Sequence, residues 1–217
     1  MKIEVFSNNR SVRPFTTWTS LADMYNYLEE NKVIENVCDK VFETGDKTLK
    51  SKLPAIMPMG NIGDKQRKKE NCMPTGLVMI DIDGKEPVNI EEAKKYFEER
   101  HQILIENYVR LIHVTPSGMG LRVLACCHYD GMEGTINRIT EKLELTKYGS
   151  VDPACKDLSR LSYLVPSKYL IFVDEKMFDD VPQESIDYMK KYQWTGTAPN
   201  DSNTNAQIGE LEANIEK

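Results

Sequence analysis

Hydrophobic residues recur along the chain with two different spacings, one typical of helices and one typical of strands. Near the N-terminus, apolar residues recur at helical spacing from Leu21 to Asn31 and again from Val33 to Glu43. Side chains three and four positions apart share one face of a helix, so both stretches favour amphipathic helices. Lys2 to Ser7 alternates as a strand does. The N-terminal part therefore predicts a small α/β unit.

The second half is organised around a short apolar run that contains two aspartates, GLVMIDIDG from Gly76 to Gly84. A run of this length, rich in Val and Ile and bounded by glycines, favours a buried strand. Alternation places Asp81 and Asp83 on one face of that strand. Two carboxylates on a buried face repel each other and lose hydration, and a divalent cation with oxygen ligands would compensate them. The alternative is a strand that ends near Ile80, with both aspartates solvated in a loop.

The elements that follow complete a recognisable order. Asn89 and Glu92 form a candidate capping box that opens a helix. Next come an apolar run (Val109–Thr115), a turn (116–120) and a returning strand (Leu121–Cys127). A helix (Gly134–Leu145) and two short extended runs (Leu161–Val165 and Tyr169–Val173) follow. Strand, helix, strand, strand, helix, strand is the split β-α-β, ferredoxin-like order, with its first and third strands adjacent. We expect helices on one sheet face and the aspartates on the other, open face.

The predicted fold class is therefore α+β, with a ferredoxin-like or RRM-like core and an N-terminal α/β extension. We place the extension, packed on the core, at residues 1–48 and the core at 49–193. Residues 194–217 are poor in apolar side chains and predict a disordered linker or tail.

Composition and charge narrow the function. The chain has 217 residues of which 40% are hydrophobic, enough for a real core, and its formal net charge is -6. That charge argues against a protein that coats polyanions, so any nucleic-acid contact must come from a local basic patch. Asp64 to Glu70, DKQRKKE, is the candidate patch. The alternative for this loop is ordinary solvated surface.

The remaining residue counts mainly exclude sites. The 5 cysteines are odd in number and lack CxxC spacing, which favours free thiols in a reducing compartment. The 3 histidines show no ligand spacing, and a Walker-type phosphate loop is absent. The sequence also shows neither a secretory signal nor an apolar run long enough for a bilayer. We therefore expect a cytoplasmic protein without a membrane partner.

Two further motifs carry candidate chemistry. The turn TPSGMGLR, from Thr115 to Arg122, offers small residues and backbone N–H groups that a phosphate can approach. Its alternative is an ordinary hairpin turn. Arg122 itself falls on the aspartate face, where it either forms a structural ion pair with the aspartates or binds a phosphate. In VDPACKDLSRLSYL, Asp152 is an isolated acidic residue, and Asp157 and Arg160 are spaced for a local salt bridge.

The order of these motifs, a DID strand, then SGMGLR, then an isolated aspartate before DLSRL, resembles the archaeo-eukaryotic primase superfamily. The similarity is to the branch with a VirE N-terminal domain in mobile-element and phage-type proteins, and KSKLPAIMPMGNI (50–62) resembles the segment that precedes its acidic strand. The resemblance covers about Leu49 to Val165.

This resemblance implies a primase-palm core that joins nucleotides on a DNA or RNA template. It implies that Asp81, Asp83 and Asp152 are catalytic and bind Mg²⁺ or Mn²⁺. It also implies a nucleotide site at five residues: Ser117, Gly118, Gly120, Arg122 and Arg160. The better-known members carry a histidine where this chain has Arg122, which puts full polymerase activity in doubt.

Three function hypotheses remain open. The first is a two-metal nucleotidyltransferase in replication of a mobile element or phage. Its partners would be nucleoside triphosphates, single-stranded or primed DNA or RNA, and a helicase domain or protein. The second is an inactive module of the same fold that binds single-stranded nucleic acid or an origin through Arg122, Arg160 and the 65–69 loop. The third is a metal-dependent phosphohydrolase.

Overall fold

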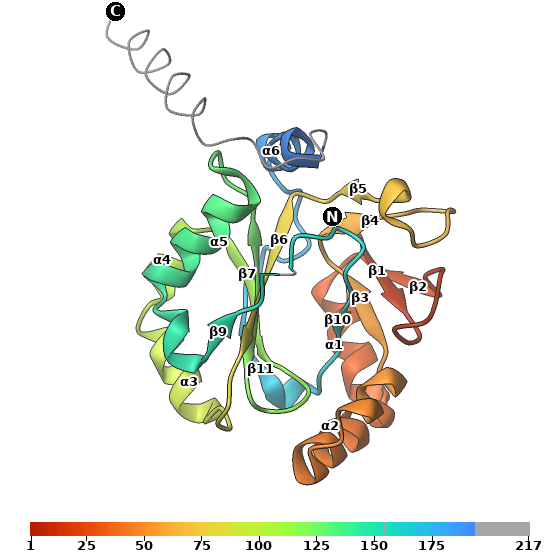
Figure 1. Ribbon diagram of the computed structural model, residues 1–217, viewed down its shortest axis with the longest axis vertical. Helices are drawn as coiled ribbons and strands as arrows, with labels where there is room; N and C mark the ends of the chain where they lie inside the picture. Colours follow the sequence, from red (N-terminus) through yellow and green to blue (C-terminus); the bar gives the residue numbers. More distant parts are fainter. Residues whose placement is uncertain (154, 194–217) are drawn as a thin grey trace, which may run out of the picture.

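The computed structural model describes residues 1–153 and 155–193, which form two larger antiparallel sheets with helices around them (Figure 1). The five-stranded sheet has the order β11-β7-β8-β6-β9. Its strands are β6 (Leu77–Asp83), β7 (Val109–Val114), β8 (Leu121–Cys126), β9 (Ser150–Val151) and β11 (Leu170–Val173). Helices α3 (Ile90–Glu98), α4 (His101–Glu106) and α5 (Gly131–Lys142) cover one face of this sheet. The predicted α+β class is confirmed.

The second, four-stranded sheet has the order β10-β3-β1-β2. Its strands are β1 (Ile3–Phe6), β2 (Thr16–Trp18), β3 (Ala55–Met57) and β10 (Ser162–Tyr163). The predicted N-terminal helices are present as α1 (Leu21–Glu30) and α2 (Lys32–Thr44). Ser20 begins α1 with a capping box, since its side chain accepts from the Asp23 N–H while the Asp23 carboxylate accepts from the Ser20 N–H. A short 3₁₀ helix, η1 (Lys47–Lys52), joins α2 to β3.

Smaller elements complete the described chain. Strands β4 (Gly60–Asn61) and β5 (Met73–Pro74) form a two-stranded ribbon, and 3₁₀ turns η2 (Lys69–Asn71), η3 (Leu145–Tyr148) and η4 (Ser167–Tyr169) lie in connections. Helix α6 (Gln183–Gln193) ends the described part. The predicted tail at 194–217 lies outside it. Among the described residues, we find no helix with both the length and the apolar character that a bilayer crossing requires.

The predicted central strand is confirmed, and so is its pairing with the returning strand. β6 pairs along its length with β8, so the first and third strands of the predicted order lie side by side. The fourth strand was assigned wrongly. The short β9 pairs with the end of β6, whereas β11 adds to the opposite edge beside β7 and β10 joins the other sheet. A two-residue strand carries too few positions for a periodic signal, which explains the error.

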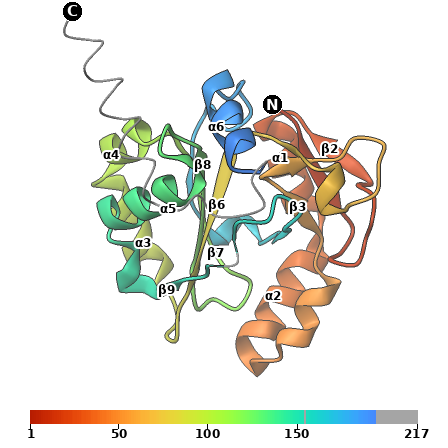
Figure 2. The ribbon, with the colours of Figure 1, turned by 45° about the horizontal axis from the view of Figure 1, so that its top comes forward.

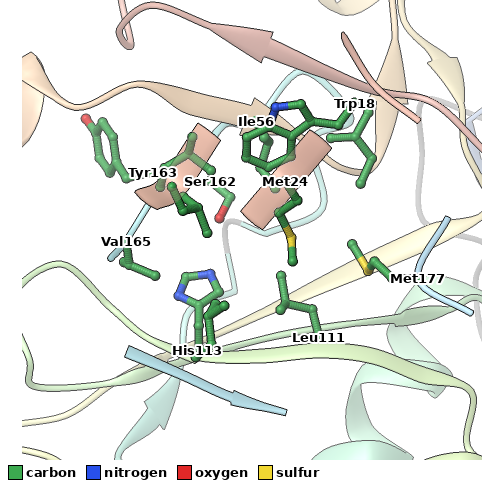
Figure 3. Close-up of a pocket in the computed structure, with 13 residues that line it drawn as sticks. Trp18, Met24, Ile56, Leu111, His113, Ser162, Tyr163, Val165 and Met177 are labelled. Carbon is green, nitrogen blue, oxygen red and sulfur yellow. The ribbon is translucent and has the colours of Figure 1, made fainter. Parts of the chain in front are cut away.

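The aspartate face of the five-stranded sheet was expected to be open, and this expectation was wrong. The four-stranded sheet lies opposite that face (Figures 1 and 2). Leu111 and His113 of β7 point toward Trp18 and Ile56 of the other sheet, around a cavity of about 20 Å³ (Figure 3). β3 pairs with β1 on one side and with β10 on the other, so the covering sheet contains strands from both sides of the predicted boundary at residue 48. Burial of these apolar side chains on both sheets holds the two layers together.

Candidate functional site

A buried ion pair occupies the centre of the aspartate face. Asp81 on β6 lies directly opposite Arg122 on β8 in the strand register. Arg122 Nε donates to Asp81 Oδ1 at 3.3 Å and Nη2 donates to Oδ2, so the contact is bidentate. Arg122 Nη1 also donates to Ser162 Oγ at 3.1 Å, across to the second sheet. Arg122 therefore has the first of its two predicted roles, the structural pair with an aspartate, and its contact with a nucleotide remains a prediction.

Asp152, far from Asp81 in the sequence, reaches the same point. The residue follows β9, and its backbone N–H donates to the Asp81 carbonyl at 2.8 Å. The pairing of β9 with the end of β6 thus brings the two aspartates together. Arg160 Nη2 lies 2.5 Å from Asp152 Oδ2 and 4.0 Å from Asp81 Oδ2. Two carboxylates and two guanidinium groups form one compact, charge-balanced cluster.

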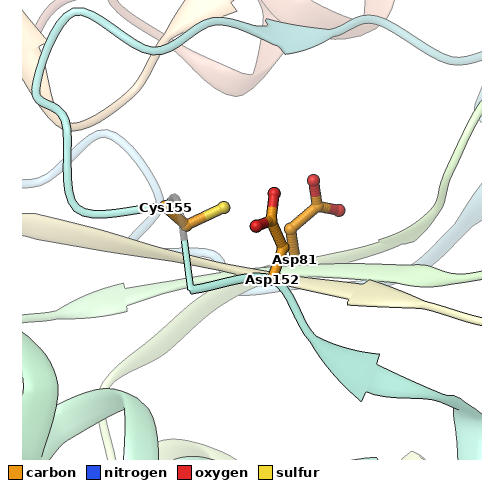
Figure 4. Close-up of side chains that lie close together, drawn as sticks. All are labelled: Asp81, Asp152 and Cys155. Atoms are coloured by element: carbon orange, nitrogen blue, oxygen red, sulfur yellow. The ribbon is translucent and has the colours of Figure 1, made fainter.

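Cys155 is a third group at this point that the sequence reasoning passed over. Its Sγ and one oxygen from each of Asp81 and Asp152 all lie within 4.8 Å of one another (Figure 4). Burial and the nearby Asp81 carboxylate raise the pKa of the Cys155 thiol to about 11. The thiol is therefore protonated near neutral pH. Its spacing three residues after Asp152 was the available signal.

Asp83 is placed differently from the other two predicted aspartates. It is the exposed last residue of β6 and does not belong to the group formed by Asp81, Asp152 and Cys155. Burial, with help from the charges of Lys47 and Arg122, lowers the pKa of the Lys50 ammonium, while Asp81 and Asp83 act in the opposite direction. Lys50 on η1 therefore lies within electrostatic reach of both β6 carboxylates, and the sequence reasoning missed this cation.

His113 lies beside the ion pair on β7, opposite Arg122 in the register. Its Nδ1 is 2.8 Å from the Val114 carbonyl oxygen, and the ring is fully buried against the cavity between the sheets (Figure 3). Burial, followed by the charge of Arg122, lowers the pKa of His113 to about 4. The ring is therefore neutral at physiological pH, and it packs against the cluster without adding charge.

The predicted phosphate turn is packed against protein at both glycines. Gly118 has a left-handed φ of 74°, and a Cβ there would lie 2.5 Å from the Phe42 ring of α2. A Cβ at Gly120 would lie 2.0 Å from the Ile82 carbonyl oxygen. Ser117 Oγ is 3.3 Å from Thr115 Oγ1 within the turn. Both glycines are explained by close packing, so phosphate binding by Ser117, Gly118 and Gly120 remains a prediction.

The donor set of the cluster fits a hard divalent cation only in part. Asp81 and Asp152 offer carboxylate oxygens, which Mg²⁺ and Mn²⁺ prefer. Cys155 offers a soft sulfur that is protonated at neutral pH, and it does not suit Mg²⁺. Arg122 and Arg160 already balance both carboxylates. A cation would therefore be held by Asp81 and Asp152, and it would have to compete with Arg160 for them.

Comparisons with known proteins give one family match. Residues 48–167 match the family described as BT4734-like, N-terminal domain, which is more than half of the chain. Neither the curated proteins nor the solved structures gave a match.

This match corrects the family named from the motifs, because the family found is not the VirE N-terminal branch of the primase superfamily. The physical reason lies in the motifs. The glycines of SGMGLR satisfy close packing and Arg122 satisfies a buried pair, so these residues serve the fold itself and are weak markers of a family. The chain belongs to the BT4734-like N-terminal domain family.

Proposed function

We propose that this chain is the nucleotide-transfer core of an enzyme of nucleic-acid synthesis, with Asp81 and Asp152 as its central carboxylates. The observation that supports this proposal is the convergence of the two aspartates at the centre of a sheet from separate parts of the chain. Carboxylates from adjacent strands are the usual means of holding divalent cations for in-line transfer at phosphorus. In this proposal the split β-α-β sheet serves as a ferredoxin-like, palm-type platform.

Arg122 and Arg160 have different roles in this proposal. Arg122 is buried and all three of its contacts are made to Asp81 and Ser162, so it stays in place and fixes the Asp81 carboxylate. The Arg160 side chain is 33% exposed and that of Asp152 is 19% exposed. Arg160 can therefore leave Asp152 and bind a phosphate of the incoming nucleotide. Asp83 lies exposed at the end of β6, where a second cation or the nucleotide can reach it.

A bound Mg²⁺ or Mn²⁺ would neutralise phosphoryl oxygens and lower the pKa of an attacking hydroxyl. Asp81 and Asp152 would hold it, and Arg160 would move from the carboxylate to the phosphate. The protein's own contribution is to position these groups in a sheltered site between two sheets, where electrostatic interactions are stronger than in water.

Incorporation of labelled nucleotides tests the proposal. The full chain is incubated with primed and unprimed DNA and RNA templates, a nucleoside triphosphate mixture, and Mg²⁺ or Mn²⁺. We expect extension that Asp81→Asn and Asp152→Asn abolish, while Asp179→Asn on an exposed loop leaves it unchanged. No incorporation on any template would contradict the proposal. Release of phosphate or pyrophosphate without extension would assign a phosphohydrolase instead.

A second candidate is a module of the same architecture that binds nucleic acid without catalysis. The observation that favours it is the charge balance of the cluster, since Arg122 and Arg160 already neutralise the carboxylates of Asp81 and Asp152. Such a module would bind oligonucleotides equally well with a divalent cation or with chelator. Fluorescence anisotropy in both conditions, together with the incorporation assay, separates the two candidates.

A further inference from the structure

Two loops on the outer side of the four-stranded sheet carry an unusual share of the basic residues. One is the β1–β2 connection, residues 7–15, and the other is the β4–β5 connection, residues 62–72. Figures 1 and 2 show them next to each other, at the side of the molecule away from α3, α4 and α5. We call these two segments together the basic loop pair.

The basic loop pair is positively charged, whereas the whole chain is negatively charged. It contains six basic and two acidic residues, although the formal net charge of the protein is -6. Five of the six cations are exposed: Arg10, Arg13, Lys65, Lys68 and Lys69. The two acidic residues, Asp64 and Glu70, flank the lysines and are also exposed. A local positive surface on an acidic protein is the electrostatic pattern expected for a polyanion site.

The sixth cation, Arg67, holds the two loops together. Its guanidinium donates to the carbonyl oxygens of Asn9 at 2.7 Å, Ser11 at 3.2 Å and Ser159 at 3.2 Å. Its backbone N–H donates to the Val12 carbonyl at 2.7 Å. The side chain of Arg67 is therefore structural, and it fixes the exposed cations of both loops on one preorganised surface.

Arg67 also connects this surface with the candidate site. Ser159, which accepts from Arg67, directly precedes Arg160, which pairs with Asp152. The turn is held by Asp157, whose side chain accepts from both the N–H and the hydroxyl of Ser159. A phosphate chain that crosses the basic loop pair would therefore reach the turn that presents Arg160.

The surface also exposes apolar side chains that bases can contact. Phe15 is 53% exposed and lies 6.1 Å, ring centroid to ring centroid, from Tyr27 of α1. Val12 is 51% exposed between Arg10 and Phe15. Sites for single-stranded nucleic acid combine cations along the backbone with aromatic rings on which bases stack. An anionic membrane also takes cations and exposed apolar side chains. The link from Arg67 through Ser159 to Arg160 at the candidate site favours a nucleic-acid strand instead.

We propose that the basic loop pair binds the phosphodiester backbone of single-stranded nucleic acid and delivers the strand to the Asp157–Arg160 turn. The exposed cations contact phosphates, Phe15 stacks on a base, and Arg67 keeps the two loops in register. The direction of delivery rests on the proposed function, but binding itself does not.

Anisotropy of a fluorescein-labelled dT20 and of the matching RNA tests this with the full-length chain at several salt concentrations. The test variant is Lys65→Gln/Lys68→Gln/Lys69→Gln. The matched control is Lys95→Gln/Lys142→Gln/Lys176→Gln, which removes the same charge from exposed lysines elsewhere. We expect the test variant to lose about tenfold or more in affinity. Its negative slope of log K against log salt should become shallower by about 2, since each single-strand phosphate contact contributes about 0.7 to the slope.

The outcomes separate the surface from the activity. A loss of oligonucleotide affinity in the test variant, with normal affinity in the control variant, supports binding at the basic loop pair. This conclusion holds even if nucleotide incorporation is absent and the proposed function fails. Equal loss in both variants means non-specific charge and overturns the proposal. Binding to phosphatidylserine vesicles but not to either oligonucleotide also overturns it. Phe15→Ala checks stacking, and we expect it to weaken binding without changing the salt slope.

Discussion

Asp81 and Arg122 lie opposite each other on adjacent antiparallel strands and form a bidentate ion pair that is almost completely buried. Arg122 continues to Ser162 on the second sheet, so the pair also ties the two layers together. A buried charge that loses its partner is costly, whereas a pair replaced as a unit by apolar residues often is not. This contrast makes the role of the pair measurable.

Arg122→Met should lower the free energy of unfolding by about 3–5 kcal/mol, because among the described residues it leaves the buried Asp81 carboxylate with Arg160, at 4.0 Å, as its remaining ion-pair partner. The double variant Asp81→Leu/Arg122→Met should recover most of that loss. Urea unfolding of both variants measures the difference. A double variant no more stable than the single one would mean that the pair is not the source of the effect.

A divalent cation should stabilise the parent protein, if Asp81 and Asp152 hold it. A ligand that binds only the folded state adds about 2.7 kcal/mol at a hundredfold excess over Kd. Melting temperatures in Mn²⁺, in Mg²⁺ and in chelator measure this. Asp152→Asn should abolish the shift, and Asp64→Asn should keep it. A parent protein that melts identically in all three conditions would rule out the cation and leave the binding module.

His113 should make stability depend on pH. Burial lowers its pKa from the usual 6.5 to about 4, and the groups that face it are Arg122 and Asp81. The unfolded chain therefore binds more protons between these two values, so the free energy of unfolding falls as the pH drops from 6.5 to 4. The loss from this residue amounts to about 3 kcal/mol. Urea unfolding across this pH range should give His113→Gln a profile that is flatter by this amount.

Gly118→Ala should destabilise the protein for two separable reasons. The left-handed φ of 74° disfavours alanine by about 1–2 kcal/mol, and the new Cβ meets the Phe42 ring at 2.5 Å. Phe42 is 45% exposed, so Phe42→Ala alone should cost little. The double variant should recover the steric part and keep the conformational part. Full recovery, or none, in a double-mutant cycle would contradict this division.

Local pattern was sufficient for much of the fold. The α1 and α2 helices, the β6 strand and the β7–β8 hairpin follow from periodicity, caps and turns, because each is a property of neighbouring residues. The same alternation predicted that Asp81 and Arg122 share a face, and the register confirms it.

What the sequence could not decide depends on contacts between distant segments. The two-residue β9 brings Asp152 to Asp81 through one backbone hydrogen bond, and no periodic signal marks so short a strand. The partner of each carboxylate was equally hidden, since the same pattern allowed Arg122 either an ion pair with the aspartates or a bound phosphate. Only burial under the four-stranded sheet decides this, because a charge removed from water must be neutralised by whatever the folded chain places beside it. The sequence by itself determined the strand and its charges, and tertiary packing decided which charges meet.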